Sequence, residues 1–170
     1  MVKRFAEPLS RKNIRLMALK FREIFGIENE LYIDVVRFLE FVLLRIGINF
    51  MIVENDEMEE EALTIPSEML IKIREDVYEG AVSGVGRYRF TIMHEIGHIF
   101  LHTEDSICLA RGKDNVEVYR DPEWQADAFA GEFLVPSHLT KNMSPAEISI
   151  KCGVSLQAAT YQKRKQKKIS

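Results

Sequence analysis

The sequence has little of what stabilises secreted or membrane-bound proteins. Its 170 residues include only two cysteines, Cys108 and Cys152, which lie far apart and form no CxxC motif, so a disulfide framework is excluded. The richest apolar stretch, residues 41–53, is interrupted by Arg45 and Asn49 and is too short to span a bilayer. The first nine residues lack the apolar segment of a signal peptide. We therefore expect a reduced, cytoplasmic protein without a membrane partner.

The chain also lacks an excess of positive charge. Its formal net charge is −3 and its pI is about 5.9, so the chain as a whole has no field that attracts nucleic acid or an anionic membrane. Hydrophobic residues make up 46% and charged residues 29%, which is ordinary for a globular protein with a buried core. The length fits one domain of about 150 residues with a small appendage.

Apolar spacing predicts the order of secondary structure. The predicted helices cover residues 10–25, 30–46, 87–102 and 122–135, followed by two short helices after residue 144. The predicted strands cover residues 48–54, 62–65 and 70–78. We expect a solvated acidic loop over residues 54–61, a flexible turn at Gly80, Gly84 and Gly86, and irregular structure over residues 103–120.

Residues 94–98 form the motif HExxH, which a random chain of this length contains with a probability of roughly less than 1%. Residues four apart on a helix lie about 40° from each other around its axis, so His94 and His98 can bind one metal ion. Glu95 lies roughly 60° from His98, close enough to hold a water at that ion. The apolar residues Ile92 and Ile96 face the other side. The pattern predicts a supported metal site.

A catalytic zinc site of this kind needs a third protein ligand and leaves the fourth position to water. His102 is eight residues past His94, about 12 Å along the helix, and is therefore too far to converge with the other two. We expect His102 to be a surface residue or one that supports a ligand. Cys108 lies in a segment without a supporting pattern. The longer metzincin motif fails because Leu101 and Glu104 stand where Gly and His are needed.

The helix over residues 122–135 offers a better third ligand. Asp121 and Pro122 form a strong helix start, and Glu123 falls in the first turn, where the helix dipole favours a carboxylate. Asp127 is four residues further on the same face. We predict that Glu123 is the third ligand and that Asp127 accepts a hydrogen bond from a ligating histidine. The rival carboxylate, Glu132, lies about 180° from Glu123 and should point away.

Two blocks of sequence resemble the signature motifs of the ImmA/IrrE family of metallopeptidases. They are RYRFTIMHEIGHIFLH (87–102) and EWQADAFAGEFLVP (123–136), and HExxH followed by Glu-xxx-Asp is similar to the gluzincin peptidases. The first block matches at Arg89, Phe90, Thr91, His94, Glu95, Gly97 and His98, and the second at Glu123, Ala126, Phe129, Ala130, Phe133, Leu134 and Pro136.

The resemblance implies a small, mostly helical α+β fold of the zincin type, with the active-site helix packed on a short β-sheet. It also implies that His94, His98 and Glu123 bind Zn²⁺ and that Glu95 is the catalytic base. The implied activity is regulatory proteolysis in the cytoplasm. The protein substrate in this family is often a helix-turn-helix repressor of a mobile element or a stress response.

We expect residues 1–143 to form the zinc metallopeptidase domain with its N-terminal helices, and residues 144–170 to form a helical hairpin and basic tail that do not fold independently. The order of a helix, a turn at Gly153 and a second helix is also typical of a DNA-binding helix-turn-helix. We favour a hairpin that covers the catalytic domain or holds its substrate, because the chain is acidic and Ser149 stands where a small Ala would help two helices cross. DNA contact through residues 144–170 is the alternative.

Two functions from different classes are consistent with these motifs. The first is a zinc endopeptidase, in which a further group stabilises the oxyanion; Tyr88, Tyr119 and His138 are the candidates, and the sequence does not distinguish them. The second is a non-proteolytic regulator that keeps the zinc fold and binds a protein partner or DNA. The intact motif favours the first, because a binding module has no chemical need of Glu95.

Overall fold

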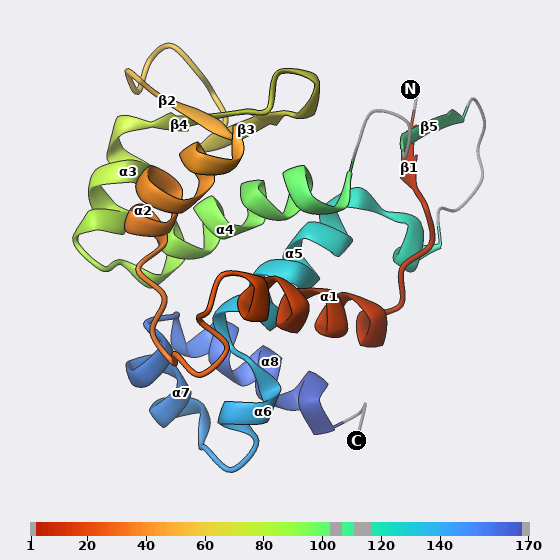
Figure 1. The fold of residues 1–170 in the computed structure, drawn as a ribbon, viewed down its shortest axis with the longest axis vertical. Helices are drawn as coiled ribbons and strands as arrows, with labels where there is room; N and C mark the ends of the chain where they lie inside the picture. Colours follow the sequence, from red (N-terminus) through yellow and green to blue (C-terminus); the bar gives the residue numbers. More distant parts are fainter. Residues whose placement is uncertain (1–2, 103–106, 111–116, 168–170) are drawn as a thin grey trace.

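Two crossing helices, α4 and α5, form the centre of the fold (Figure 1). The structure, a computed structural model, describes residues 3–102, 107–110 and 117–167. The helices are α1 (Arg11–Ile24), α2 (Val35–Arg37), α3 (Glu75–Val82), α4 (Gly86–Leu101), α5 (Pro122–Leu134), α6 (Ser137–Thr140), α7 (Pro145–Cys152) and α8 (Leu156–Lys167). The strands are β1 (Lys3–Ala6), β2 (Asn49–Val53), β3 (Ala62–Ile65), β4 (Leu70–Arg74) and β5 (Ile107–Ala110).

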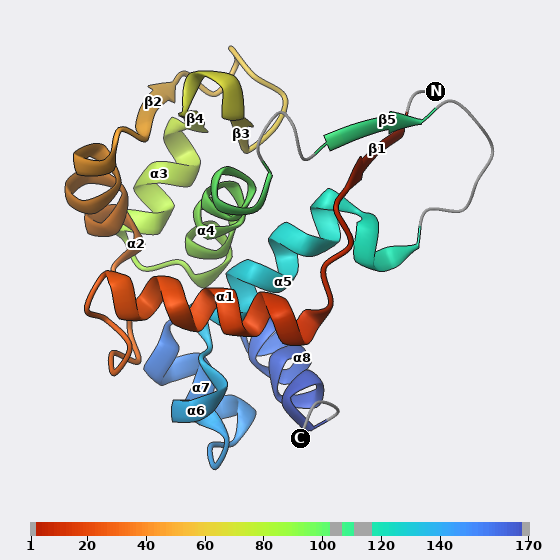
Figure 2. The same ribbon diagram turned by 45° about the vertical axis from the view of Figure 1, so that its right-hand side comes forward.

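Helices α4 and α5 approach closely at Gly97. A Cβ atom added there would lie 3.2 Å from the Phe129 ring and 3.4 Å from the Ala126 backbone, so a larger residue would push the helices apart. Helix α1 packs along α5. The small sheet and the α7–α8 hairpin lie at opposite ends of the molecule (Figures 1 and 2).

The sheet has the strand order β2-β4-β3. Strand β2 runs parallel to β4, and β3 runs antiparallel to β4 and joins it through the 3₁₀ turn η3 (Pro66–Glu68). The central strand alternates, with Ile71 and Ile73 fully buried, as expected for a strand with one face on a core. Strand β3 packs against α4. The predicted α+β fold, with the motif-bearing helix on a short sheet, is confirmed.

The predicted strand over residues 70–78 is wrong beyond Arg74. Helix α3 begins at Glu75 and buries Val77 and Ala81, which are four residues apart. The acidic pair Glu75 and Asp76 lies in its first turn, where the helix dipole favours negative charge. Gly80, which we expected in a flexible turn, lies inside this helix. The position is a glycine because the ring of Tyr88 fills the space that a side chain would need.

The predicted helix over residues 30–46 is shorter and less regular than expected. It begins at Val35, because the side chain of Asp34 accepts a hydrogen bond from the backbone N–H of Arg37 at 3.1 Å and caps the helix. It then continues as a π-helical segment, η1 (Phe38–Leu43), and a 3₁₀ turn, η2 (Leu44–Ile46).

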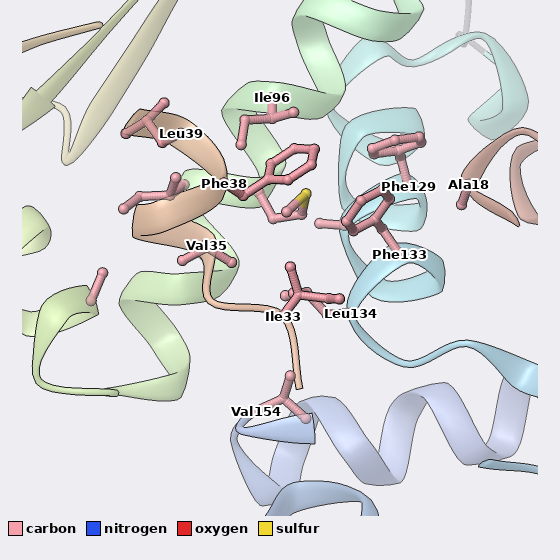
Figure 3. Close-up of a cluster of buried hydrophobic side chains, with 14 of the residues drawn as sticks. Ala18, Ile33, Val35, Phe38, Leu39, Ile96, Phe129, Phe133, Leu134 and Val154 are labelled. Atoms are coloured by element: carbon pink, nitrogen blue, oxygen red, sulfur yellow. The ribbon is translucent and has the colours of Figure 1, made fainter. Parts of the chain in front are cut away.

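The main core lies between η1, α4 and α5 (Figure 3). Phe38 from η1, Ile96 from α4 and Phe133 from α5 meet there, and Phe38 and Phe133 have ring centroids 5.6 Å apart. Fully burying a side chain of this kind contributes about 1.5–3 kcal/mol. The apolar side of α4 is thus held by the core, and its histidine side faces away.

The N-terminal strand β1 pairs antiparallel with β5. We predicted neither strand, and β5 corrects the prediction of irregular structure over residues 103–120. Another part of that segment forms the 3₁₀ turn η5 (Val118–Arg120). Residues 103–106 and 111–116, which fall under the same prediction, lie outside the described residues, as does the side chain of Cys108.

The C-terminal hairpin is tied to the motif-bearing helix by a buried arginine. Arg89 of α4 donates hydrogen bonds to the backbone carbonyls of Cys152 and Gly153, where the hairpin turns, and to that of Ile33. Helix α7 begins with a capping box between Ser144 and Glu147. No helix in the described part of the chain combines the length and apolarity needed to cross a membrane.

Candidate metal centre

Three predicted ligands come together where α4 crosses the first turn of α5. Nε2 of His94 lies 3.0 Å from Nε2 of His98 and 3.2 Å from a carboxylate oxygen of Glu123. Nε2 of His98 lies 3.5 Å from the other Glu123 oxygen. One ligand atom from each residue thus lies within 4.8 Å of the other two.

This spacing fits a tetrahedral ion with short bonds to nitrogen and oxygen. Ligand atoms at about 2.0–2.1 Å from a tetrahedral Zn²⁺ lie about 3.3 Å from each other, and the distances among the two imidazoles and the two oxygens of Glu123, from 3.0 to 3.5 Å, bracket that value. The donors are two imidazoles and one carboxylate, a set that zinc uses in catalytic sites. The side chain of Glu123 is 71% exposed, so the cluster is open to solvent on the side of Glu123.

Asp127 lies where it can orient His94. Its carboxylate oxygen is 2.8 Å from Nδ1 of His94. A carboxylate only accepts hydrogen bonds, so the Nδ1–H group of His94 donates to it. In the neutral imidazole, Nε2 then keeps its lone pair and points it at the ligand cluster.

A second chain of hydrogen bonds orients His98 and begins at Gln125. The side-chain amide nitrogen of Gln125 donates to the backbone carbonyls of Glu7 at 2.7 Å and Tyr119 at 2.8 Å. Its oxygen must therefore be the atom that faces Nε2 of His102, at 2.9 Å. As a result, Nε2 of His102 carries a proton and donates it to Gln125.

The tautomer of His98 follows from that of His102. His102 is fully buried, and burial lowers its pKa to about 4, so it is neutral and its Nδ1 only accepts. Nδ1 of His98 lies 2.9 Å away and must be the donor. In the neutral imidazole of His98, Nε2 is then left with a lone pair directed at His94 and Glu123, which is the form that binds a metal.

The charges in the cluster favour a cation. Burial lowers the pKa of His94, but its hydrogen bonds with Asp127 and Glu123 outweigh burial and raise the pKa to about 10. The hydrogen bond that Glu123 accepts from His94 holds the pKa of the Glu123 carboxyl well below its usual range. Glu123 is therefore an anion at neutral pH, and a metal ion bound here would replace the proton that His94 otherwise shares with it.

Glu95 lies on α4 beside the edge strand of the sheet. The hydroxyl of Thr64, on β3, is 2.7 Å from a carboxylate oxygen of Glu95 and 2.9 Å from its backbone carbonyl. A hydroxyl has one proton to donate, so the two acceptors share it. The contact fixes the carboxylate against the sheet, and Glu95 is largely buried.

Glu132 lies on the opposite side of α5 from Glu123. One of its oxygens is 3.0 Å from Nε of Arg11 and the other is 2.9 Å from Nε of Arg15, both on α1. The side chain of Glu132 is completely buried. The rival carboxylate is therefore held between two cations, away from the histidines.

None of the hydrogen bonds that the described residues make joins the three predicted oxyanion donors to this cluster. Tyr88 packs against Gly80 on α3. Nε2 of His138 lies 2.8 Å from the backbone carbonyl of Glu28, on a helix that follows the far end of α5. Tyr119 is closer in sequence to Glu123, and its hydroxyl donates to Glu117.

Sequence reasoning missed the roles of Thr64 and Gln125 and left that of His102 open between surface and support. His102 is at the i+4 position from His98, which is a usable signal for a contact between two side chains on one helix. Thr64 and Gln125 lie on other elements, and only the packing of β3 and α5 against α4 brings them near.

The described geometry agrees with a comparison against known families. A family model described as Peptidase_M78, IrrE N-terminal-like domain, matches residues 45–162, which is well over half of the chain. The match includes the two histidine ligands, Glu95 and Glu123, as well as α7 and the first part of α8. A comparison with curated proteins finds no match.

Proposed function

Since the chain belongs to the IrrE N-terminal-like family of peptidases, which supports a metallopeptidase-like function, we propose that it is a zinc-dependent endopeptidase. The observation that carries the proposal is the convergence of His94, His98 and Glu123 on one point, with Glu95 next to His94 on the same helix. A structural zinc site is usually closed by four protein ligands. Here three ligands meet at an exposed face, as in a catalytic site.

In this proposal, some residues bind the zinc ion and others transfer a proton. Zinc bound here supplies a Lewis acid that acidifies water and polarises a peptide carbonyl. His94 and His98 bind through Nε2 because Asp127 and His102 occupy their Nδ1 atoms. Glu95 takes a proton from water on its carboxylate and passes it to the leaving amine. Thr64 holds that carboxylate in position.

The substrate we propose is a cytoplasmic regulatory protein, a helix-turn-helix repressor of a mobile element or a stress response. This part rests on the resemblance of the two signature blocks to the ImmA/IrrE family. The exposed side chain of Glu123 supports it, because a polypeptide can approach the ligand cluster from that side.

The test combines metal content with cleavage by two forms of the protein. The chain is co-expressed with a repressor encoded in a neighbouring reading frame, as the wild type and as Glu95→Gln. We expect both forms to bind one zinc ion and only the wild type to produce repressor fragments. If both forms bind zinc and leave the repressor equally intact, the protein is not its protease, and the non-proteolytic regulator becomes the better account.

The alternative, a non-proteolytic regulator, is tested by measuring DNA binding. Helix α8 carries the basic residues Lys163, Arg164, Lys165 and Lys167, so the hairpin is the natural DNA contact. Binding to DNA that weakens steeply with salt and disappears after charge removal at these four positions would support it. We expect no such binding, because the inner face of α8 packs on α5 at Gly131.

A further inference from the structure

A cavity of about 340 Å³ lies beside the metal centre, between α4, α5, α8 and the start of α1. Its size is at the small end of the range of ligand pockets, about 300–1,000 Å³. Four apolar residues line it, namely Phe90, Trp124, Ala128 and Ala158. The cavity is separate from the three ligand atoms but shares one wall residue with the centre, since Asp127 lines it and also binds His94 at 2.8 Å.

Helical geometry places the cavity next to Glu123, on the neighbouring part of the surface of α5. The α5 residues in its wall lie between about 40° and 140° from Glu123. On α4, Phe90 is one turn before His94 and lies on nearly the same face. The cavity and the ligand cluster are therefore neighbours on α4 and α5, close enough for one bound polypeptide to contact both.

The two charged residues in the wall each have a partner in the protein. Arg11 is a wall residue, but its guanidinium donates to Glu132 and to Gln162. Asp127 directs one carboxylate oxygen at His94. A charged ligand group would lose its hydration against the apolar part of the wall, whereas an apolar group there would be sheltered from water by Trp124 and Phe90.

The C-terminal hairpin supplies one side of the cavity. Gln157, Ala158 and Tyr161 on α8 line it, and α8 is held close to α5 because Gly131 has no side chain: an added Cβ would lie 2.8 Å from the side-chain oxygen of Gln162. The hairpin thus contributes part of a binding surface next to the metal centre.

We infer that this cavity binds one large apolar side chain, such as Leu or Phe, of the substrate polypeptide, within two residues of the bond that is cut. The inference rests on the proposed peptidase function, because it takes the polypeptide to lie across the metal centre. It assigns the α7–α8 hairpin a role in selecting substrate sequence.

Trp124 provides the test, because it is the only tryptophan of the chain and lines the cavity. Its fluorescence is followed while the zinc-loaded Glu95→Gln protein is titrated with blocked tripeptides, acetyl-Ala-Xaa-Ala-amide, where Xaa is Leu, Phe, Lys or Glu. We expect the Leu and Phe peptides to bind at least about tenfold more tightly than the Lys and Glu peptides, as burial of an apolar side chain predicts.

Variants on α8 localise the binding. Ala158→Phe fills the cavity and should weaken binding of the Leu peptide about tenfold. Leu156→Phe is the matched control, because Leu156 is exposed on the same helix and is not a wall residue. Ala158→Glu places a carboxylate in the wall and should reverse the preference towards the Lys peptide. Thermal melting of each variant shows that it is folded.

The inference fails if Lys and Leu peptides bind equally, if a folded Ala158→Phe protein binds the Leu peptide as before, or if 1-hexanol saturates the fluorescence change while no peptide binds. Because these titrations measure binding without hydrolysis, their outcome does not depend on whether the wild-type protein cleaves a substrate. Peptide selectivity without any cleavage by the wild type would contradict the peptidase and leave the cavity as a peptide-binding site.

Discussion

Helix α5 carries two glutamates with opposite surroundings. Glu123 and Glu132 are nine residues apart, which places them about 180° from each other around the axis. The side chain of Glu123 is 71% exposed and faces two imidazoles. The side chain of Glu132 is 0% exposed and lies between the guanidinium groups of Arg11 and Arg15.

The difference shows that the partners of a carboxylate decide what it can do. Arginine keeps its charge at every accessible pH, so Glu132 has permanent counter-ions and no free coordination site. A histidine, unlike an arginine, can give up a proton and bind a metal through the freed nitrogen, so the partners of Glu123 can become metal ligands together with it. One glutamate therefore stabilises the fold, and we assign the other to the metal.

The largest effect we expect is on stability. Glu132→Ala leaves two largely buried arginines unpaired and should lower the free energy of unfolding by about 3–5 kcal/mol. Glu123→Ala, an exposed change, should stay within about 0.5 kcal/mol of the wild type when zinc is absent. Urea denaturation of both variants with a chelator present measures the difference. A larger loss in Glu123→Ala would contradict the comparison.

The reverse ranking is expected for zinc. Glu123→Ala removes a ligand and should weaken zinc binding more than about 100-fold, beyond the 10–100-fold typical of supporting residues. Glu132→Gln, which keeps the shape of the buried side chain, should change it little. Competition with a chromophoric chelator gives both affinities. Equal affinities in Glu123→Ala and the wild type would exclude Glu123 as a ligand.

A smaller loss of zinc affinity is expected from His102→Phe. This variant keeps a buried ring but removes the acceptor that fixes the tautomer of His98, so we expect zinc to bind about 10–100-fold more weakly. His138→Phe is the matched control, since His138 binds the backbone carbonyl of Glu28 instead. If both variants bind zinc as the wild type does, the hydrogen bonds from Gln125 through His102 do not orient His98.

The smallest effect is expected from Thr64→Val. The change removes the hydroxyl that holds the Glu95 carboxylate and leaves all three ligands in place. One hydrogen bond is worth about 0.5–1.5 kcal/mol, so kcat should fall roughly two- to tenfold. KM and zinc content should be unchanged. A loss of zinc in this variant would show that Thr64 supports the ligands rather than the base.

The parts of the site that lie on one helix could be predicted from the sequence. The spacing of His94 and His98, and the opposite directions of Glu123 and Glu132, follow from 100° per residue. Reasoning from periodicity failed in one short segment, because the strand predicted over residues 70–78 ends at Arg74. The alternation of Ile71 and Ile73 there changes to the four-residue spacing of Val77 and Ala81.

The parts that depend on contacts between distant segments could not be predicted. The arginines that neutralise Glu132 lie 117 and 121 residues away in the sequence. Gln125 reaches His102 only because α4 and α5 cross closely at Gly97. The pairing of β1 with β5 joins segments about a hundred residues apart, and neither segment has a strong strand pattern of its own.

The most direct test of the account is anomalous diffraction at the zinc edge from crystals of the protein grown with zinc. We predict one peak at about 2.0–2.1 Å from Nε2 of His94, Nε2 of His98 and a carboxylate oxygen of Glu123. A peak on other residues, or none at this position in zinc-loaded crystals, would contradict the assignment of these residues as the metal ligands.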